Sequence, residues 1–197
     1  MIILGIDPGL GSTGVGVIEE QPGRQWKALF HDDVTTDPRM PLPARLEKIN
    51  DLVAKTIGEF HPDAAAVESV FFARNVRSVV MMAHGRGVAI LAAAQTGLEV
   101  FEYSPLEIKQ SVVGKGRAGK DQVKQMVMVL LQLAKAPRSD HQSDALACAL
   151  CHAFRSGAVE TRAKLMQQAD PESRDAAYEQ RKALLGLSLK RGAKRRR

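Results

Sequence analysis

The chain has 197 residues, of which 45% are hydrophobic and 25% are charged. This composition is ordinary for a globular protein with an apolar core, and the length favours one compact domain with a small appendage. No apolar run has the length of a membrane helix, residues 1–7 lack the features of a signal peptide, and two cysteines give no disulfide framework. We therefore expect a cytoplasmic protein.

The formal net charge of +6 is concentrated near the C-terminus. Residues 155–197 contain 12 Lys and Arg against 5 Asp and Glu, so the rest of the chain is close to neutral. Apolar periodicity also weakens after residue 157. We interpret residues 1–156 as the folded domain and residues 157–197 as a basic, flexible tail that is free to contact phosphates non-specifically.

The pattern of apolar residues predicts five strands and five helices. The first three strands form a β-meander, and a Gly at position 97 ends the long helix that follows the fourth strand. Ser139 and Gln142 form a capping-box pattern at the start of the last helix. This order predicts an α/β protein with a mixed five-stranded sheet flanked by helices. The strands are expected at 2–7, 13–19, 26–35, 64–67 and 98–103, and the helices at 41–58, 75–96, 104–113, 119–134 and 140–155.

Three acidic residues lie beside segments that we expect to be buried. Asp7 ends the first strand, Glu68 ends the fourth, and Asp144 lies in the first turns of the last helix. An isolated carboxylate is costly in such a place unless it is paired or binds a cation. If the first and fourth strands are neighbours, Asp7 and Glu68 lie side by side at a sheet edge where α/β ligand sites form. The three carboxylates therefore predict a site for hard cations such as Mg²⁺ or Mn²⁺.

Several motifs, in order and at plausible spacing over residues 2–154, make the chain resemble the RuvC family of Holliday-junction resolvases. The motifs are Leu4-Gly5-Ile6-Asp7-Pro8-Gly9, Thr13-Gly14-Val15-Gly16, residues 67–75, residues 85–89, residues 109–114, Lys120-Asp121-Gln122-Val123 and Asp144-Ala145-Leu146-Ala147.

The resemblance implies an RNase H-like fold and a structure-selective endonuclease of homologous recombination and DNA repair. Such an enzyme resolves four-way DNA junctions by paired, metal-dependent phosphodiester hydrolysis. It also implies a homodimer and partners that are branch-migration proteins of the RuvA and RuvB type. We expect two divalent cations per subunit, Mg²⁺ or Mn²⁺, about 3.5–4 Å apart around the scissile phosphate. Asp7 is the best candidate to bridge them.

The family pattern implies four metal-binding positions, and the fourth departs from it. Asp7, Glu68 and Asp144 match three directly. The fourth position, commonly acidic, is His141, with Asp140 beside it. Either side chain shares a helix face with Asp144, so spacing does not choose between them. We prefer His141, because Asp140 has a sufficient role in complementing the helix dipole, and a nitrogen ligand favours Mn²⁺ over Mg²⁺.

The DNA contacts are predicted from aromatic and basic residues near the acidic set. Phe71 is expected to stack on a base unpaired near the junction centre, although adjacent aromatics in such turns are also often core residues. Lys109 and Lys120 match positions where the family carries basic residues near the site, and we count them with the catalytic group. The predicted DNA-binding set is Phe71, Arg74, Asn75, Arg77, Lys109, Lys115, Arg117 and Lys120.

Three other interpretations of these residues were open. The Asp7-x-Gly9 motif and the glycines up to Gly16 also resemble the first phosphate loop of actin-like ATPases, but those enzymes need two such domains and a longer chain. A non-catalytic junction-binding protein is compatible with the departure at His141. Cys148-x-x-Cys151 suggests zinc only weakly, because a single pair inside a helix lacks the remaining ligands, and core packing is the simpler interpretation.

Overall fold

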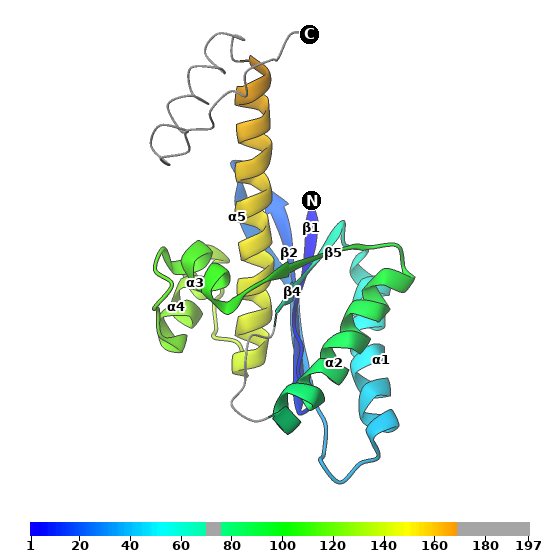
Figure 1. Cartoon of the computed structure of the whole chain (residues 1–197). Coiled ribbons are helices and arrows are strands. Elements are labelled where there is room, and N and C mark those ends of the chain that lie inside the picture. The colour runs from blue at the N-terminus through cyan, green and yellow to red at the C-terminus, as the bar shows by residue number, and fades with distance from the viewer. Residues whose placement is uncertain (70–75, 169–197) are drawn as a thin grey trace, which may run out of the picture. The chain divides into compact units, whose positions relative to one another are not determined.

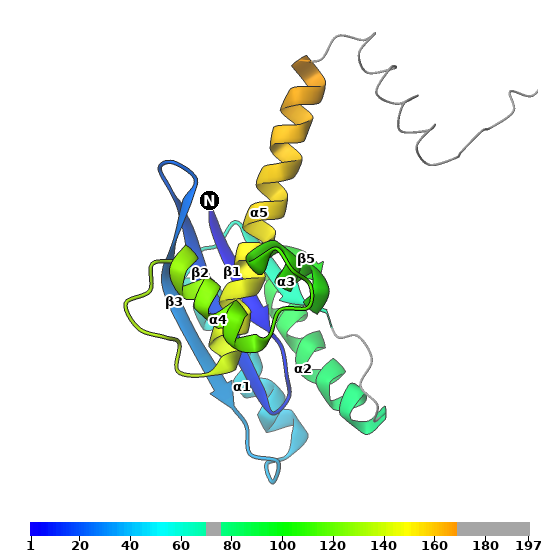
Figure 2. The ribbon, with the colours of Figure 1, turned by 90° about the vertical axis from the view of Figure 1, so that its left-hand side faces the viewer.

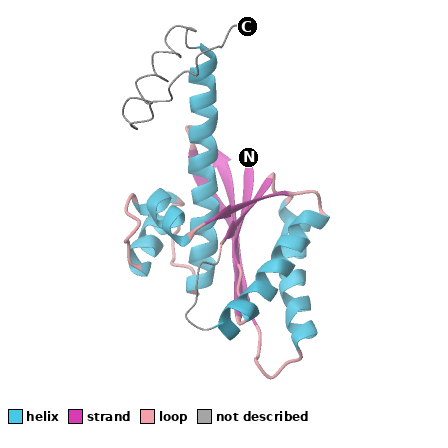
Figure 3. Ribbon diagram, in the orientation of Figure 1, coloured by secondary structure: helices cyan, strands magenta, loops and turns pink. Residues whose placement is uncertain are grey.

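The computed structural model describes residues 1–69 and 76–168, with the side chains of 76–78 and 158–168 left aside. Its sheet has the strand order β3-β2-β1-β4-β5. Figures 1 and 3 show this sheet nearly edge-on, with helices on either side of it. β1 pairs antiparallel with β2 and β2 with β3, whereas β4 pairs parallel with both β1 and β5. The predicted mixed sheet and meander are confirmed. The strands are β1 (Ile2–Asp7), β2 (Ser12–Gln21), β3 (Gln25–Thr35), β4 (Ala64–Glu68) and β5 (Glu99–Tyr103).

Five helices occur in the predicted order, and two of their boundaries differ from the prediction by more than two residues. The helix expected to end at residue 134 ends at Leu130, because Gln132 adopts a left-handed backbone (φ 51°) that stops the helix without a glycine. The last helix extends beyond residue 155 to Gln168. The helices are α1 (Leu42–Phe60), α2 (Val76–Gln95), α3 (Pro105–Val113), α4 (Lys120–Leu130) and α5 (Asp140–Gln168).

Helices cover both faces of the sheet (Figures 1 and 2). On one face, α1 and α2 bury the side chains of Leu4 and Ile6 from β1. On the other face, α3, α4 and the first part of α5 bury Ile3 and Ile18. Burial on both faces explains why β1 and β4 are nearly continuous apolar runs, since successive side chains of a strand point to opposite sides.

Residues 1–155 form one compact unit. α5 runs past its end, so at least the beginning of the segment predicted as a tail is helical, while residues 169–197 lie outside the described part. Cys148 and Cys151 are free and buried in the core beside the sheet, as expected for packing residues. No helix within the described residues has the length and apolar character needed to cross a membrane.

Candidate metal and DNA-binding site

Asp7 and Glu68 lie side by side at one edge of the sheet. β1 and β4 are parallel neighbours, with Ile6 paired to Val67, so the two carboxylates follow at the same carboxyl edge. β1 is also the central strand of the five. The expectations that the first and fourth strands are neighbours and that the first strand is central are therefore confirmed.

The first turns of α5 bring His141 and Asp144 to the same edge, and glycines allow the helix to come that close. A Cβ added at Gly5 would lie 2.0 Å from the carbonyl oxygen of Ala145, and one at Gly14 would lie 2.1 Å from that of His141. Both distances are shorter than any tolerable contact. The helix backbone thus lies directly on β1 and β2, and only glycine fits at these two positions.

One pocket of about 340 Å³ collects all six residues predicted as catalytic. Apolar side chains from α3 and α4 complete its wall. Because acidic and basic groups line the same hollow, it can hold cations on the acidic side and a phosphate beside the lysines. The lining residues are Asp7, Glu68, Lys109, Lys120, His141 and Asp144, with Pro105, Ile108 and Val123.

Two carboxyl groups of this pocket, those of Glu68 and Asp144, are disfavoured in their ionised form. Burial raises the pKa of Glu68 from 4.5 to about 8, and the negative charges of Asp7 and Asp144 act in the same direction. Burial also raises the pKa of Asp144 from 3.8 to about 6, again with help from Asp7. Lys109 and Lys120 lower these two values only in part. Together the carboxyl groups favour binding of additional positive charge.

His141 and Asp140 have different partners. The Nδ1–H of His141 donates to Oδ2 of Asp7 at 2.7 Å, and this hydrogen bond raises the pKa of His141. Asp140 instead forms ion pairs of 3.8 Å with Lys120 and Lys124, and its side chain is 57% exposed. Asp140 is not among the residues that line the pocket, whereas His141 is.

The carboxylates and the imidazole of the pocket are suitable ligands for divalent cations, although they do not lie close enough together to coordinate a metal ion. Among the residues that the structure describes, no three His, Cys, Asp or Glu side chains are close enough together to hold a metal ion as they stand. Three carboxylates and an imidazole nevertheless line one hollow, and hard cations favour such oxygen ligands. An imidazole that donates from Nδ1 to Asp7 keeps Nε2 as its possible ligand atom.

The predicted DNA contacts are only partly visible. Phe71, Arg74 and Asn75 lie outside the described residues, as does the side chain of Arg77 in α2. Lys115 and Arg117 are exposed in the loop between α3 and α4 and do not line the pocket.

Sequence reasoning missed Lys124, which joins Lys120 in pairing with Asp140. The signal for it was present in the sequence. Residues four apart share a helix face, so Lys124 extends the basic side of α4 beyond Lys120.

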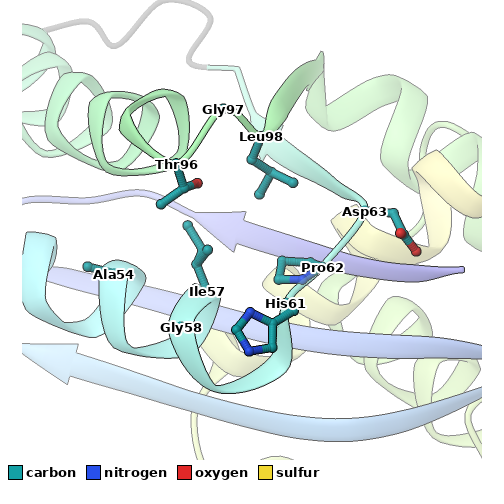
Figure 4. Close-up of a pocket in the computed structure, with 9 residues that line it drawn as sticks. All are labelled: Ala54, Ile57, Gly58, His61, Pro62, Asp63, Thr96, Gly97 and Leu98. Carbon is teal, nitrogen blue, oxygen red and sulfur yellow. The ribbon is translucent and has the colours of Figure 1, made fainter.

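A second hollow, of about 450 Å³, lies where α1 and α2 end, at the amino end of β4 (Figure 4). Ala54 and Ile57 line it from α1, and Thr96 and Leu98 from the turn after α2. Its one carboxylate, Asp63, already accepts a hydrogen bond of 2.6 Å from the backbone of Ile2. Although larger, this hollow lacks the convergent charged groups of the pocket at the carboxyl edge.

Known proteins match almost the whole of the compact unit. Residues 3–152 match the family model described as crossover junction endodeoxyribonuclease RuvC. A protein of that name from Alkaliphilus oremlandii is 47% identical over 160 residues, which cover 81% of this chain and 97% of the relative. Thermus thermophilus RuvC in complex with Holliday junction substrate superposes with a TM-score of 0.75 at 36% identity, covering 79% of this chain and 94% of that structure.

A further structure, of Thermus thermophilus RuvC, has a TM-score of 0.72 at 37% identity, covering 79% of this chain and 95% of that structure. These likenesses, together with the mixed five-stranded sheet and its flanking helices, show that the fold is RNase H-like.

Proposed function

The chain belongs to the RuvC family of crossover junction endodeoxyribonucleases, and from that membership we infer that it resolves Holliday junctions as a metal-dependent endonuclease. The observation that carries this function is the pocket at the carboxyl edge of the sheet, where Asp7, Glu68 and Asp144 meet two lysines. The enzyme thereby serves DNA recombination and repair, and it uses divalent cations.

We propose that two divalent cations, Mg²⁺ or Mn²⁺, bind per subunit. Asp7, Glu68, Asp144 and His141 are the proposed ligands. The raised pKa values of Glu68 and Asp144 support this, because each carboxyl gains most from a nearby positive charge. The pocket-facing position of His141 supports it over Asp140, which pairs with two lysines instead. When bound, the cations supply Lewis-acid stabilisation of the charged transition state in phosphodiester hydrolysis.

The chain's own groups position the scissile phosphate. Lys109 and Lys120 border the same pocket and provide positive charge that attracts and orients a phosphodiester. Lys115, Arg117 and Lys124 extend this positive charge along the surface, in positions suited to contacts with the DNA backbone. Phe71, Arg74, Asn75 and Arg77 remain proposed DNA contacts on the strength of the sequence.

A homodimer is part of the proposal, because two symmetric nicks need two equivalent sites. The outer face of α2 is the proposed interface. Two large apolar side chains are exposed on it, Val80 (48% exposed) and Leu91 (54% exposed). Three small residues are exposed on the same face, namely Ala83, Gly87 and Ala94. The opposite face of α2 already packs on the sheet through Ala89 and its neighbours. A helix that is apolar on both faces is typical of one that packs on two sides.

The remaining proposals rest on the family alone. They are a cytoplasmic location and cooperation with branch-migration proteins of the RuvA and RuvB type.

An Asp7→Asn variant tests the assignment of the site. We expect it to bind a synthetic four-way junction as tightly as the parent and to leave the junction uncut in either Mg²⁺ or Mn²⁺. Gel-shift and strand-cleavage assays on the same labelled junction measure the two properties. Cleavage at the parental rate by Asp7→Asn would exclude this pocket as the catalytic site.

A further inference from the structure

Three residues in one row of the sheet lie under the first turn of α5. Asp7 of β1 pairs with Gly14 of β2, and Gly14 pairs with Asp33 of β3. Directly paired residues project their side chains to the same side of a sheet. Since Gly14 lies against the backbone of His141 and Gln142, the two carboxylates of the row flank the point where helix and sheet touch.

Each carboxylate of this row binds a different side of the turn. Oδ2 of Asp7 accepts the hydrogen bond from His141 at 2.7 Å. Oδ1 of Asp33 accepts from Ser139 Oγ at 3.0 Å and from Gln142 Nε2 at 2.5 Å. Hydrogen bonds on both sides therefore hold the turn that carries His141 and leads to Asp144. Of the two carboxylates, Asp7 lines the pocket and Asp33 does not.

Gln142 links Asp33 to the backbone of the turn. It is 3% exposed, and its Oε1 accepts from the backbone N–H of Arg138 at 3.1 Å and from Nδ1 of His31 at 2.9 Å. Its own backbone N–H donates to Ser139 Oγ at 3.2 Å. Without Asp33, a buried amide N–H loses its acceptor, which is costly enough to change how the turn sits on the sheet.

We propose that Asp33 is a positioning residue for catalysis: its carboxylate fixes the first turn of α5 so that His141 and Asp144 face Asp7. This inference rests on the proposed function. Asp33 does not line the pocket, and its hydrogen bonds reach the turn through Ser139 and Gln142. A displacement on the order of 1 Å at such a site reduces a catalytic rate by about 100-fold.

Two variants and a matched control separate this role from a general effect of charge. Asp33→Ala removes the acceptor, whereas Asp33→Asn keeps an Oδ1 that can accept both hydrogen bonds. Asp32→Ala is the control, because Asp32 precedes Asp33 on the same strand, is exposed and projects to the other face of the sheet, and its carboxylate accepts from the backbone N–H of Asp33 and not from α5. We expect the Asn variant and the control to behave like the parent.

The first readout is amide hydrogen exchange over residues 139–145, measured without metal or DNA. We expect Asp33→Ala to accelerate exchange there by at least about 10-fold while exchange elsewhere in the compact unit stays at the parental rate. The second readout is the cleavage rate at saturating junction, expected to fall by at least about 10-fold, with junction Kd in EDTA within about 2-fold of the parent.

Each result has a defined meaning. Parental exchange or parental cleavage by Asp33→Ala overturns the positioning role. A parent chain that leaves the junction intact overturns the proposed function instead, and the positioning role with it. If Asp33→Ala does not fold, Ser139→Ala carries the same expectation at about 3-fold, because it removes one of the two contacts to Asp33, together with the cap on the backbone N–H of Gln142, while the Gln142 side-chain amide keeps Asp33 as its acceptor. Parental cleavage by Ser139→Ala would then overturn the inference.

Discussion

Replacing Glu68 by glutamine is expected to stabilise the metal-free protein while it abolishes cleavage. Burial and the neighbouring carboxylates raise the pKa of this carboxyl in the folded chain to about 8, whereas an exposed glutamate, as in the unfolded chain, has a pKa of 4.5. A carboxyl whose pKa is raised by folding contributes stability below pH 4.5, and that contribution is lost as the pH rises towards 8. Glutamine does not ionise, so the Glu68→Gln variant does not lose stability in this way as the pH rises.

The size of the effect follows from the two pKa values. At pH 7 the folded parent still holds the proton on Glu68 and the unfolded parent has released it. At about 1.4 kcal/mol per pKa unit, the free energy of unfolding of Glu68→Gln should exceed that of the parent by about 3 kcal/mol at pH 7. The difference should approach about 5 kcal/mol above pH 8 and vanish near pH 4.

Urea unfolding in EDTA between pH 4 and pH 9 measures this difference, and Trp26, the single tryptophan, is a buried fluorescence probe for it. Glu47→Gln, at an exposed position of α1, is the matched control and should show no such gain. Adding Mg²⁺ should reduce the advantage of Glu68→Gln, because the cation stabilises the parent by binding to its folded state. An advantage that is absent at pH 7, or equal at pH 4 and pH 8, would refute the reasoning.

Four further substitutions test the packing of α5 on the sheet, the pocket and the proposed dimer interface. Gly14→Ala should lower the free energy of unfolding by about 3 kcal/mol through its clash with the helix backbone, whereas Gly11→Ala, with open space around it, should change it by less than about 0.5 kcal/mol in urea titrations. Lys120→Ala should slow junction cleavage by at least about 10-fold at an unchanged Tm. His141→Asp should raise the ratio of the cleavage rate in Mg²⁺ to that in Mn²⁺, and an unchanged ratio would count against His141 as a ligand. Leu91→Lys should convert the proposed dimer to a monomer in size-exclusion chromatography with light scattering, and a persistent dimer would exclude the outer face of α2 as the interface.

The sequence predicted the acidic edge well, because it depends on local patterns. Apolar runs that end in Asp7 and Glu68 identify strand ends, and the parallel pairing of β1 and β4 brings those ends together. The start of α5 was likewise predicted from Ser139, whose Oγ does accept from the N–H of Gln142. Only half of the expected capping box forms, since the Gln142 side chain turns to Asp33.

What the sequence did not predict depends on contacts between distant segments. Asp33 is one of two adjacent aspartates on an edge strand, and nothing local distinguishes it from Asp32. Its role follows from the register that aligns it with Gly14 and Asp7. The alternation of Gly14 and Gly16 was a usable signal, because residues two apart in a strand share a face and paired glycines there indicate a close approach of another backbone.

The central claim is that the pocket containing Asp7 cuts four-way DNA junctions with the help of divalent cations. It is tested most directly by incubating the full-length chain with a labelled synthetic junction and, in parallel, with a linear duplex of the same sequence. The account predicts paired nicks in the junction in Mg²⁺ or Mn²⁺, no nicks in EDTA, and an intact duplex throughout. A junction left uncut in both metals, or equal cutting of duplex and junction, would contradict it.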